Sequence, residues 1–385
     1  MNILLVSVGI DWISVARLPK PLRGAGFTVL ACCPEGSLLD RSGFLHGGAR
    51  LRPPVTPESV WTALRHLRGR WGGSFVVPGD EPTIRLLHGF LQRPPADADD
   101  TDRAVLADLA ASLGDPDMHD AVSRKSYLCA LSDNAARRFP PQAAVDHTTN
   151  VFALADRIGY PLVLKKDFSA GGTGVFEIGS VEALEDFVAR SNAFLRHGRR
   201  DARPHAGQTG VVQRLLSGRS ASVSLVAMRG RVVAAFAYAK VAGGPARMGG
   251  TSVAGALQRP DLIEAARDLT AHFGFTGFAG VDFLLDNQTD EAYVLEFNAR
   301  PTLTSHLGHL FGADLCAALA AALSNRPPPA PGKALPLVSL FPSEWQRDPA
   351  SRYLAEAHHD VPWDDPALLK ALFEMGYAGA TTGSA

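Results

Sequence analysis

The amino-acid sequence predicts an α/β region followed by an α+β region, with a Pro-rich linker and a tail at the C-terminal end. Near the N-terminus, apolar strand patterns alternate with helix patterns, an order typical of a parallel sheet. Further along, one pair of strand patterns flanks Arg229–Arg231 and another flanks Asn287-Gln288, and such short turns predict antiparallel pairing. The 385 residues, 46% of them hydrophobic, suffice for two or three domains with real cores.

The N-terminal region contains three strand patterns and two helix patterns in alternation. The strands are predicted over Met1–Val8, Phe27–Ala31 and Phe75–Pro78, and the helices over Trp12–Gly24 and Pro82–Phe90. The first turn lacks GxGxxG, which argues against a dinucleotide-binding fold. Asp80 and Glu81 follow the third strand, where they either contact a substrate or only cap the next helix.

The middle of the chain combines a lysine-ended strand with a glycine-rich loop. The predicted elements are a loop over Arg93–Asp102, helices over Ala121–Asn134 and Val151–Ile158, a strand over Leu162–Lys166 and a loop over Ser191–Gly207. Lys165 ends a buried strand, which costs desolvation unless an anion is bound there. The alternative is a side chain whose charged end reaches water. Gly171, Gly172, Thr173 and Gly174 then form a flexible tip whose N–H groups can close over phosphates.

The following region is mostly antiparallel in its patterns. Strands are predicted over Gly210–Gly218, Ser222–Met228 and Val232–Lys240, a Gly-rich loop over Val241–Gly255, a helix over Pro260–Phe273 and a Pro-rich linker over Asn325–Lys333. Lys240 either belongs to a site or serves as a charge that protects an edge strand. Arg247 and Ser252, inside the Gly-rich loop, either touch substrate or only keep the loop soluble.

Two neighbouring strand patterns, Gly280–Phe283 and Tyr293–Pro301, organise the predicted site. Because alternate residues of a strand share a face, Glu296, Asn298 and Arg300 should project together, while Leu295 and Phe297 face a core. Asp282 on the adjacent strand can join them. Two carboxylates and an amide oxygen suit Mg²⁺ carrying nucleotide phosphates, and the arginine offers planar donors to the same phosphates. The alternative is a surface hairpin with solvated acids.

Composition restricts the class of protein. The net charge of −1 and the pI near 6.9 argue against nucleic-acid binding, which normally needs a basic face. The four cysteines show neither CxxC spacing nor matching His pairs, so neither a zinc site nor a disulfide framework is predicted, and a reducing cytoplasm is expected. The apolar stretch Ile3–Ile10 is too short to span a membrane.

These motifs together resemble the ATP-grasp superfamily of carboxylate–amine ligases, in particular its carbamoyl-phosphate-synthase-like and D-alanine–D-alanine-ligase-like members. The resemblance rests on four pieces in the right order: Leu162–Lys165 with its glycine loop, Gln213–Gly218, Gly280–Phe283 and Glu296–Arg300. Val76–Asp80 also resembles part of the domain that precedes ATP-grasp in these members. It implies a pre-ATP-grasp α/β domain (1–113), a two-subdomain ATP-grasp domain (114–327, divided near 207) and a linker with a tail that packs on the body (328–385).

The resemblance also implies roles for individual residues. Asp282, Glu296 and Asn298 would be metal ligands, Arg300 would hold the transferring phosphate, and Lys240 would lie near the γ-phosphate. Independently of the resemblance, the Gly-, Ala- and Ser-rich composition around Arg247, directly after Lys240, predicts that this loop closes and that Arg247 binds the acceptor. The nucleotide contacts would be Lys125 (or its neighbour Arg124), Lys165, Gly171, Gly172, Thr173, Gly174, Gln213, Arg214, Leu216 and Ser220.

Three positions depart from the pattern of the family. Gln213 replaces an acid that faces the adenine amine, although an amide oxygen can still accept from that amine. Ser220 stands where many members carry a glutamate. Gly280 replaces an arginine of the D-alanine ligases, which argues against a D-alanine dipeptide as the product.

The implied activity is ATP-dependent ligation with Mg²⁺ or Mn²⁺. A carboxylate would become an acyl phosphate, and an amine would displace phosphate. Two alternatives stay open: a phosphotransferase or carboxyphosphate-forming member, and an ATP-binding module without turnover. The expected partners are small-molecule substrates rather than nucleic acid or membrane, and a homodimer is compatible with the sequence. The tail is expected to act as a lid or dimer arm, with a substrate-specific element as the alternative.

Overall fold

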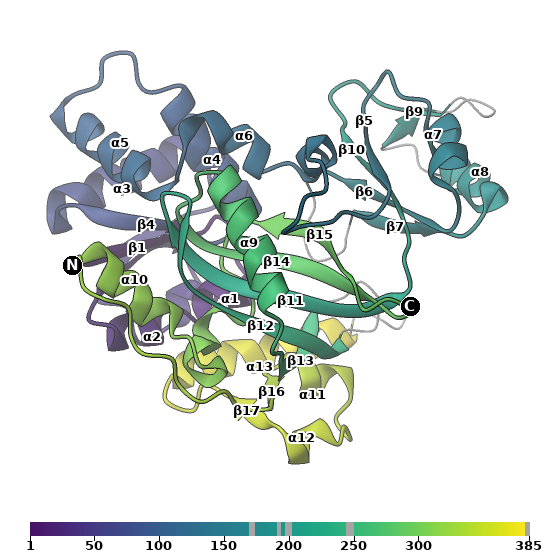
Figure 1. Ribbon diagram of the computed structural model, residues 1–385. Helices are drawn as coiled ribbons and strands as arrows, with labels where there is room; N and C mark the ends of the chain where they lie inside the picture. Colours follow the sequence, from purple (N-terminus) through teal and green to yellow (C-terminus); the bar gives the residue numbers. More distant parts are fainter. Residues whose placement is uncertain (169–173, 191–193, 197–201, 244–249, 382–385) are drawn as a thin grey trace.

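The computed structural model describes residues 1–168, 174–190, 194–196, 202–243 and 250–381, and Figure 1 shows their arrangement. The N-terminal region is a four-stranded parallel sheet with strand order β3-β2-β1-β4. Its strands are β1 (Asn2–Val6), β2 (Thr28–Pro34), β3 (Gly47–Leu51) and β4 (Ser74–Pro78). The prediction of a parallel α/β region is therefore confirmed.

Both faces of this sheet are covered, as expected for parallel strands. Leu4 and Val6 pack in one core under α3 (Pro57–Trp71), α4 (Glu81–Gln92) and α5 (Asp100–Ser112). Ile3 and Leu5 face a second core with α1 (Ile13–Ala16), α2 (Pro19–Gly24) and the short helix η1 (Leu39–Arg41). The second core also includes side chains of the C-terminal half, so the N-terminal sheet and the rest of the molecule share one core.

A second sheet is antiparallel and lies at the upper right of Figure 1. Its order is β5 (Gln142–Val145), β10 (Gly210–Arg214), β6 (Leu162–Lys166) and β7 (Val175–Ile178). The helices α7 (Val151–Ile158) and α8 (Val181–Arg190) pack on it around a separate core. The short strands β8 (Leu195–Arg196) and β9 (Arg203–Pro204) form a small pair of their own.

The third sheet has seven strands in the order β15-β14-β11-β12-β13-β16-β17. Its strands are β11 (Gly218–Met228), β12 (Arg231–Gly243), β13 (Thr251–Ala256), β14 (Gly277–Asp286), β15 (Ala292–Asn298), β16 (Leu337–Leu340) and β17 (His358–Asp360). One face packs on α9 (Pro260–His272), and the other packs on η4 (Ser305–Phe311) and α10 (Leu315–Leu323). This sheet carries the predicted oxygen site on its first two strands.

The C-terminal tail supplies two strands and three helices. The helices are α11 (Ser343–Arg347), α12 (Tyr353–Glu356) and α13 (Pro366–Thr381). β16 pairs with β13, and β17 pairs with β16, so the tail extends the seven-stranded sheet. The fully buried Glu344 accepts a hydrogen bond from Ser252 Oγ at 2.6 Å and is paired with Arg347.

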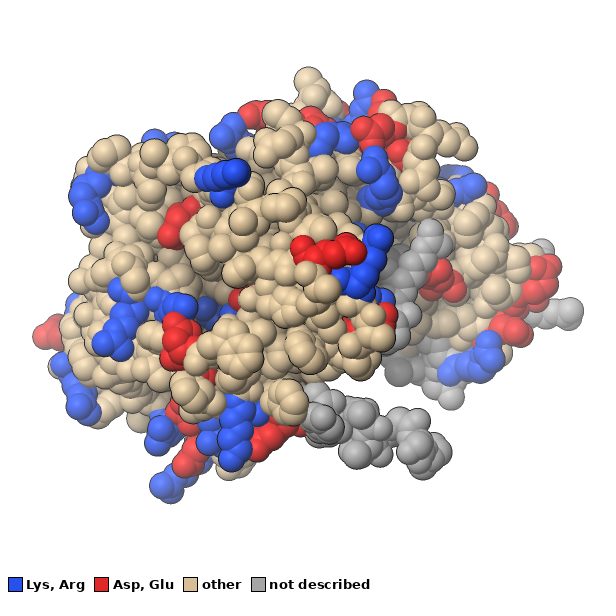
Figure 2. Space-filling view, turned by 90° about the horizontal axis from the view of Figure 1, so that it is seen from below, with Lys and Arg blue, Asp and Glu red and all other residues tan. Residues whose placement is uncertain are grey.

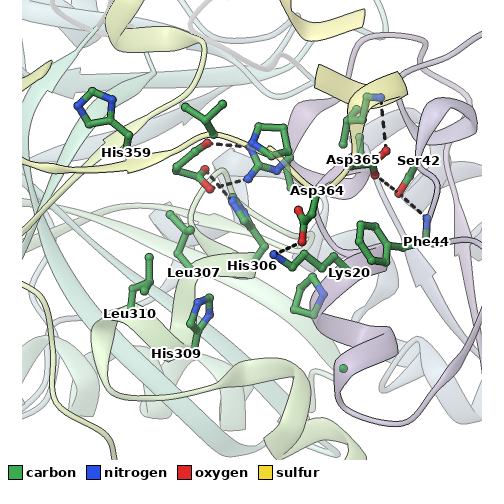
Figure 3. Close-up of a pocket in the computed structure, with 18 of the residues that line it drawn as sticks. Lys20, Ser42, Phe44, His306, Leu307, His309, Leu310, His359, Asp364 and Asp365 are labelled. Atoms are coloured by element: carbon green, nitrogen blue, oxygen red, sulfur yellow. Dashed lines mark hydrogen bonds and ion pairs between the residues drawn. The ribbon is translucent and has the colours of Figure 1, made fainter. Parts of the chain in front are cut away.

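A buried ionic cluster ties this tail to the N-terminal region (Figure 3). Arg17 Nη2 donates to Asp360 Oδ1 at 2.5 Å, and His306 Nε2 lies 2.8 Å from Asp360 Oδ2. Burial alone would raise the pKa of Asp360, but His306 and Arg17 bring that pKa below its usual value. Beside the cluster is a cavity of about 410 Å³. Two further contacts cross the same junction, from Lys20 to Asp364 and from Ser42 to Asp365.

Charged side chains are mixed on the face shown in Figure 2. Lysine and arginine alternate there with aspartate and glutamate, and no extended patch of one sign is visible. Within the described ranges, no single helix is long and apolar enough to cross a membrane; only the bent pair of η4 and α10 reaches that length and composition together.

Several predicted elements differ from those observed. The helix expected over Ala121–Asn134 is broken into α6 (His119–Val122) and the 3₁₀ helix η3 (Lys125–Ala130), with Arg124 extended between them. The reason is a competing interaction: the carboxylate of Asp167 accepts from both the N–H and the Oγ of Ser126. The helix expected over Trp12–Gly24 is also interrupted, just before Pro19, because proline cannot donate within a helix.

Two predicted loops are shorter than expected. The loop over Val241–Gly255 gives way to strand at both ends, because β12 continues to Gly243 and β13 begins at Thr251. Ser252 is thus a buried strand residue bonded to Glu344, and the prediction that it touches substrate or solubilises a loop is wrong. The loop over Arg93–Asp102 ends earlier, since Asp99 caps α5 in a capping box with Asp102.

A stacked pair of histidines joins α4 to the segment that precedes the site. His88 and His119 are both buried, with ring centroids 3.8 Å apart and planes within 4° of parallel. Burial lowers the pKa of His88 to about 3, helped by the neighbouring His119. Both rings are therefore neutral at pH 7. The stack fixes α4, which carries Glu81 and Arg85, against α6.

We expect acid to weaken this contact. The unfolded chain binds a proton at His88 near pH 6.5 and the folded chain only near 3, so the contribution is complete above pH 6.5 and is lost as the pH falls toward 3. Relative to His88→Phe, the wild type should lose about 2 kcal/mol of unfolding free energy between pH 7 and pH 5. Urea unfolding at both pH values measures this difference. Parallel pH profiles for the two proteins would contradict it.

Candidate functional site

Strands β14 and β15 bring the predicted oxygen ligands together. Asp282 pairs with Glu296, and Gly280 pairs with Asn298, across the antiparallel register. Asn298 Nδ2 donates to Asp282 Oδ2 at 2.9 Å, and Ser222 Oγ on β11 donates to Asp282 Oδ1 at 2.7 Å. The burial of Asp282, followed by the nearby charge of Glu296, raises its pKa. Ser222 was not predicted; its register opposite Asp282 becomes visible only once β11 is paired.

A β-bulge on β15 changes one part of the prediction. Phe283 pairs with Val294 rather than Leu295, so Leu295 is the extra residue. Val294 and Phe297 are the buried side chains, and the prediction that Leu295 faces a core is wrong. The Leu295 carbonyl instead accepts a hydrogen bond from Lys165 Nζ at 3.5 Å.

Two lysines stand opposite the two carboxylates. Lys125 Nζ lies 3.0 Å from Glu296 Oε1 and donates to the Asp167 carbonyl at 3.2 Å. Lys165 is only 7% exposed. Burial lowers the pKa of Lys165, and the neighbouring Lys125 lowers it further, while the carboxylates of Glu296 and Asp282 oppose this shift. The cluster therefore balances two positive groups against two negative groups in a space with little water.

The donor set fits a magnesium ion that carries phosphates. No group of three or more His, Cys, Asp or Glu side chains in the described ranges could hold a metal ion by itself. Asp282 and Glu296 supply two carboxylates, and Asn298 supplies an amide oxygen. Mg²⁺ is commonly held in this way, by one or two carboxylates plus substrate phosphates and water.

Arg300 and Lys240 approach the same cluster from different elements. Arg300 Nε donates to Glu81 Oε1 at 2.6 Å, and its guanidinium lies 4.7 Å from the ring centroid of Trp12. Burial lowers the pKa of Lys240 on β12, while the charge of Asp282 acts in the opposite direction. That coupling places Lys240 within electrostatic reach of Asp282.

Asp80 and Glu81, left open by the sequence, have separate roles. Asp80 accepts from Thr83 N–H at 2.8 Å and so caps α4, and it also accepts from Ser7 Oγ and the Gly9 N–H. The capping interpretation is therefore confirmed for Asp80. Glu81 faces the site instead, through its ion pair with Arg300.

The residues predicted to contact adenine lie at the end of β10 and the start of β11. Gln213 is buried, and its Nε2 donates to Gln142 Oε1 at 2.7 Å, which leaves the Gln213 amide oxygen as an acceptor. The Arg214 N–H donates to the Pro141 carbonyl at 2.8 Å, and the predicted contact between the Arg214 backbone and adenine stays a prediction. Leu216 follows in the connection to β11, on which Ser220 lies two residues before Ser222 and on the same face.

Part of the predicted site lies outside the described residues. These positions are Gly171, Gly172, Thr173 and Arg247. Gly174 is described, and its carbonyl accepts from the Lys166 N–H at 2.9 Å, closing the base of the β6–β7 hairpin.

A pocket of about 290 Å³ opens beside the oxygen ligands. Glu296 and Asn298 line one side, and Trp12, Glu81 and Arg85 of the N-terminal region line the other. Arg124, Lys125, Asp167 and Phe168 complete the polar and aromatic lining. Sequence patterns missed Arg85 and Phe168, because a lone arginine on an amphipathic helix and a phenylalanine before a loop carry no distinctive signal.

Comparisons with known proteins identify the fold. Residues 128–304 match the ATP-grasp domain family. N5-carboxyaminoimidazole synthetase from Staphylococcus aureus, solved with ADP, is similar with a TM-score of 0.59, 13% identity and coverage of 86% of this chain and 80% of that chain. No curated protein sequence matches significantly.

Two further solved structures share the fold. L-amino acid ligase from Bacillus licheniformis has a TM-score of 0.55, 16% identity and coverage of 84% and 74% of the two chains. Biotin carboxylase from Campylobacter jejuni has a TM-score of 0.60, 15% identity and coverage of 86% and 72%. The predicted resemblance to ATP-grasp proteins is thus confirmed, and at these identities the similarity concerns the fold.

Proposed function

We propose that this chain, whose residues 128–304 form an ATP-grasp domain, is an ATP-dependent ligase that activates a carboxylate as an acyl phosphate and transfers it to an amine. The observation that carries the proposal is the convergence of Asp282, Glu296 and Asn298 with Lys125 and Lys165 beside an open pocket. A cluster of positively and negatively charged side chains beside a pocket is suited to stabilising the charge that develops during phosphoryl transfer.

The nucleotide would be held by residues from both antiparallel sheets. Gln213 would accept from the adenine amine, while Lys165, Lys125 and Lys240 would face the phosphates. Asp282, Glu296 and Asn298 would hold Mg²⁺ or Mn²⁺, which neutralises phosphate charge when bound. Lys165 suits this task because its burial costs least when an anion is bound beside it.

The reaction would proceed by attack of an acceptor carboxylate oxygen on the γ-phosphorus of ATP, with ADP as the leaving group. An amine then attacks the acyl phosphate carbonyl, and phosphate leaves. The residues of this chain contribute position and charge: Arg300, held by Glu81, stabilises the transferring phosphoryl group, and the pocket aligns the acceptor. The alternatives are a phosphotransferase or carboxyphosphate-forming enzyme and an ATP-binding module without turnover.

The wider organisation belongs to the same proposal. Residues 1–113 would form a pre-ATP-grasp domain, 114–327 the ATP-grasp domain and 328–385 a tail that completes its sheet. The substrates would be a small carboxylate and a small amine, in the cytoplasm, and a homodimer is compatible with this arrangement. The Staphylococcus aureus structure, solved with ADP, supports the nucleotide assignment.

An ADP-release assay over pairs of carboxylates and amines tests this function. We expect ADP release that requires Mg²⁺ and one class of carboxylate, with a product whose mass equals carboxylate plus amine minus water. A product that keeps the phosphoryl group would identify a phosphotransferase instead. Tight binding of an ATP analogue without ADP release from any pair would favour the module without turnover.

A further inference from the structure

Arg85 differs from the other charged groups that line the pocket. Lys125 is paired with Glu296, Arg124 with Asp120 at 2.8 Å, and Glu81 with Arg300. Asp167 accepts hydrogen bonds from Ser126 and Thr209. Within the described ranges the guanidinium of Arg85 forms no ion pair, and its one specific contact is with an aromatic ring.

That ring belongs to Phe168, which is 43% exposed although it is a large apolar side chain. The guanidinium carbon of Arg85 lies 4.1 Å from the ring centroid, and that of Arg124 lies 5.3 Å from it. An aromatic ring attracts a cation without using its N–H donors. The contact therefore holds Arg85 in place and leaves its donors for a planar anion.

We place the acceptor of the proposed reaction in this pocket. Its lining includes Glu296 and Asn298, Lys125 at the proposed phosphate position, and Trp12 and Arg85 of the N-terminal region, but neither Lys165 nor Gln213. An acceptor carboxylate near Glu296 would therefore extend toward Arg85. The volume of about 290 Å³ is just below the roughly 300–1,000 Å³ usual for ligand pockets, so the acceptor must be short.

We propose, building on the ligase function above, that Arg85 selects an acceptor with a second anionic group. One carboxylate of the acceptor is activated beside Glu296, and a second carboxylate or a phosphate is bound by Arg85. Arg85 is thus a specificity-determining residue of the N-terminal region. An acceptor with a neutral group at that end would leave the guanidinium without an ionic partner in a partly enclosed site, which costs binding free energy.

The test uses pairs of acceptors that differ by one anionic group. Glutarate is compared with its monoamide, and 3-phosphoglycerate with glycerate, at fixed ATP, Mg²⁺ and amine. The wild type should prefer the member with two anionic groups in kcat/KM by about 10- to 100-fold. The pair with the larger ratio distinguishes a second carboxylate from a phosphate. Arg85→Ala should abolish the preference while the KM for ATP stays nearly unchanged, and Arg85→Lys should restore part of it.

Arg103→Ala is the matched control, because Arg103 is an exposed arginine of α5 that pairs with Asp100 away from the pocket. It should keep the wild-type preference. Calorimetric binding of glutarate and 3-phosphoglycerate in the presence of a non-hydrolysable ATP analogue tests Arg85 even if no ADP is released. Binding that Arg85→Ala removes would support the inference although the ligase function failed. Equal discrimination or equal binding by wild type and Arg85→Ala would overturn it, as would a wild type that prefers the neutral acceptors.

Discussion

Glu296→Gln is expected to lower the rate of ADP release by about 10²-fold or more while the protein stays folded. Glu296 faces Asp282 across the β14–β15 register and contacts Lys125, so its charge acts where phosphate charge develops. Glutamine keeps the shape and the hydrogen-bonding capacity but not the negative charge. The measurement is steady-state ADP release with the best substrate pair, combined with thermal unfolding of both proteins.

Glu264→Gln is the matched control for this variant. Glu264 lies on the exposed side of α9, where it pairs with Arg267, and its substitution should leave the rate unchanged. Release of ADP by Glu296→Gln at the wild-type rate would refute the metal assignment. A large drop in unfolding temperature would instead show that Glu296 matters for the fold.

Lys165→Met should weaken the binding of an ATP analogue by about 30-fold, the usual scale for the loss of a charge-assisted contact to phosphate. Methionine preserves the buried volume, so no cavity contributes to the effect. Burial lowers the pKa of Lys165, which shows that burying the ammonium charge costs free energy. Removal of this charge should therefore have little effect on the free energy of unfolding. Isothermal titration calorimetry with a non-hydrolysable analogue gives the affinity.

Lys166→Met provides the comparison on the same strand. Lys166 is the next residue of β6 and points to the opposite face, toward the rings of Phe176 and Phe194. Its substitution should change the affinity for the analogue by less than about threefold, because its charge lies on the face of β6 opposite to Lys165. Equal affinities of Lys165→Met and the wild type would refute the contact between Lys165 and the nucleotide phosphates.

The sequence predicts correctly those features that depend only on residues close together in the chain. The strand over Leu162–Lys166 has its expected bounds, and Asp282 lies beside Glu296 and Asn298 because a short turn fixes the register of neighbouring strands. These arguments need only the two-residue repeat of a strand and the turn at Asn287.

Long-range contacts account for the rest. The break after α6 depends on the carboxylate of Asp167, which lies 41 residues beyond its partner Ser126. Ser252 became a strand residue because the tail pairs with β13. Arg85 reaches the site only when the N-terminal sheet packs against the remainder, and no sequence pattern contains that information.

The cluster of Arg17, His306 and Asp360 also constrains the order in which the molecule can be completed during synthesis. The ribosome releases α1 early, whereas His306 and Asp360 emerge hundreds of residues later. The N-terminal sheet can therefore form cotranslationally, but the guanidinium of Arg17 must stay hydrated until β17 arrives. Docking of this late strand buries the charge, adds β17 at the edge of the seven-stranded sheet and joins the C-terminal tail to the N-terminal region. The contact between α1 and the C-terminal tail can therefore form only after β17 has been synthesised.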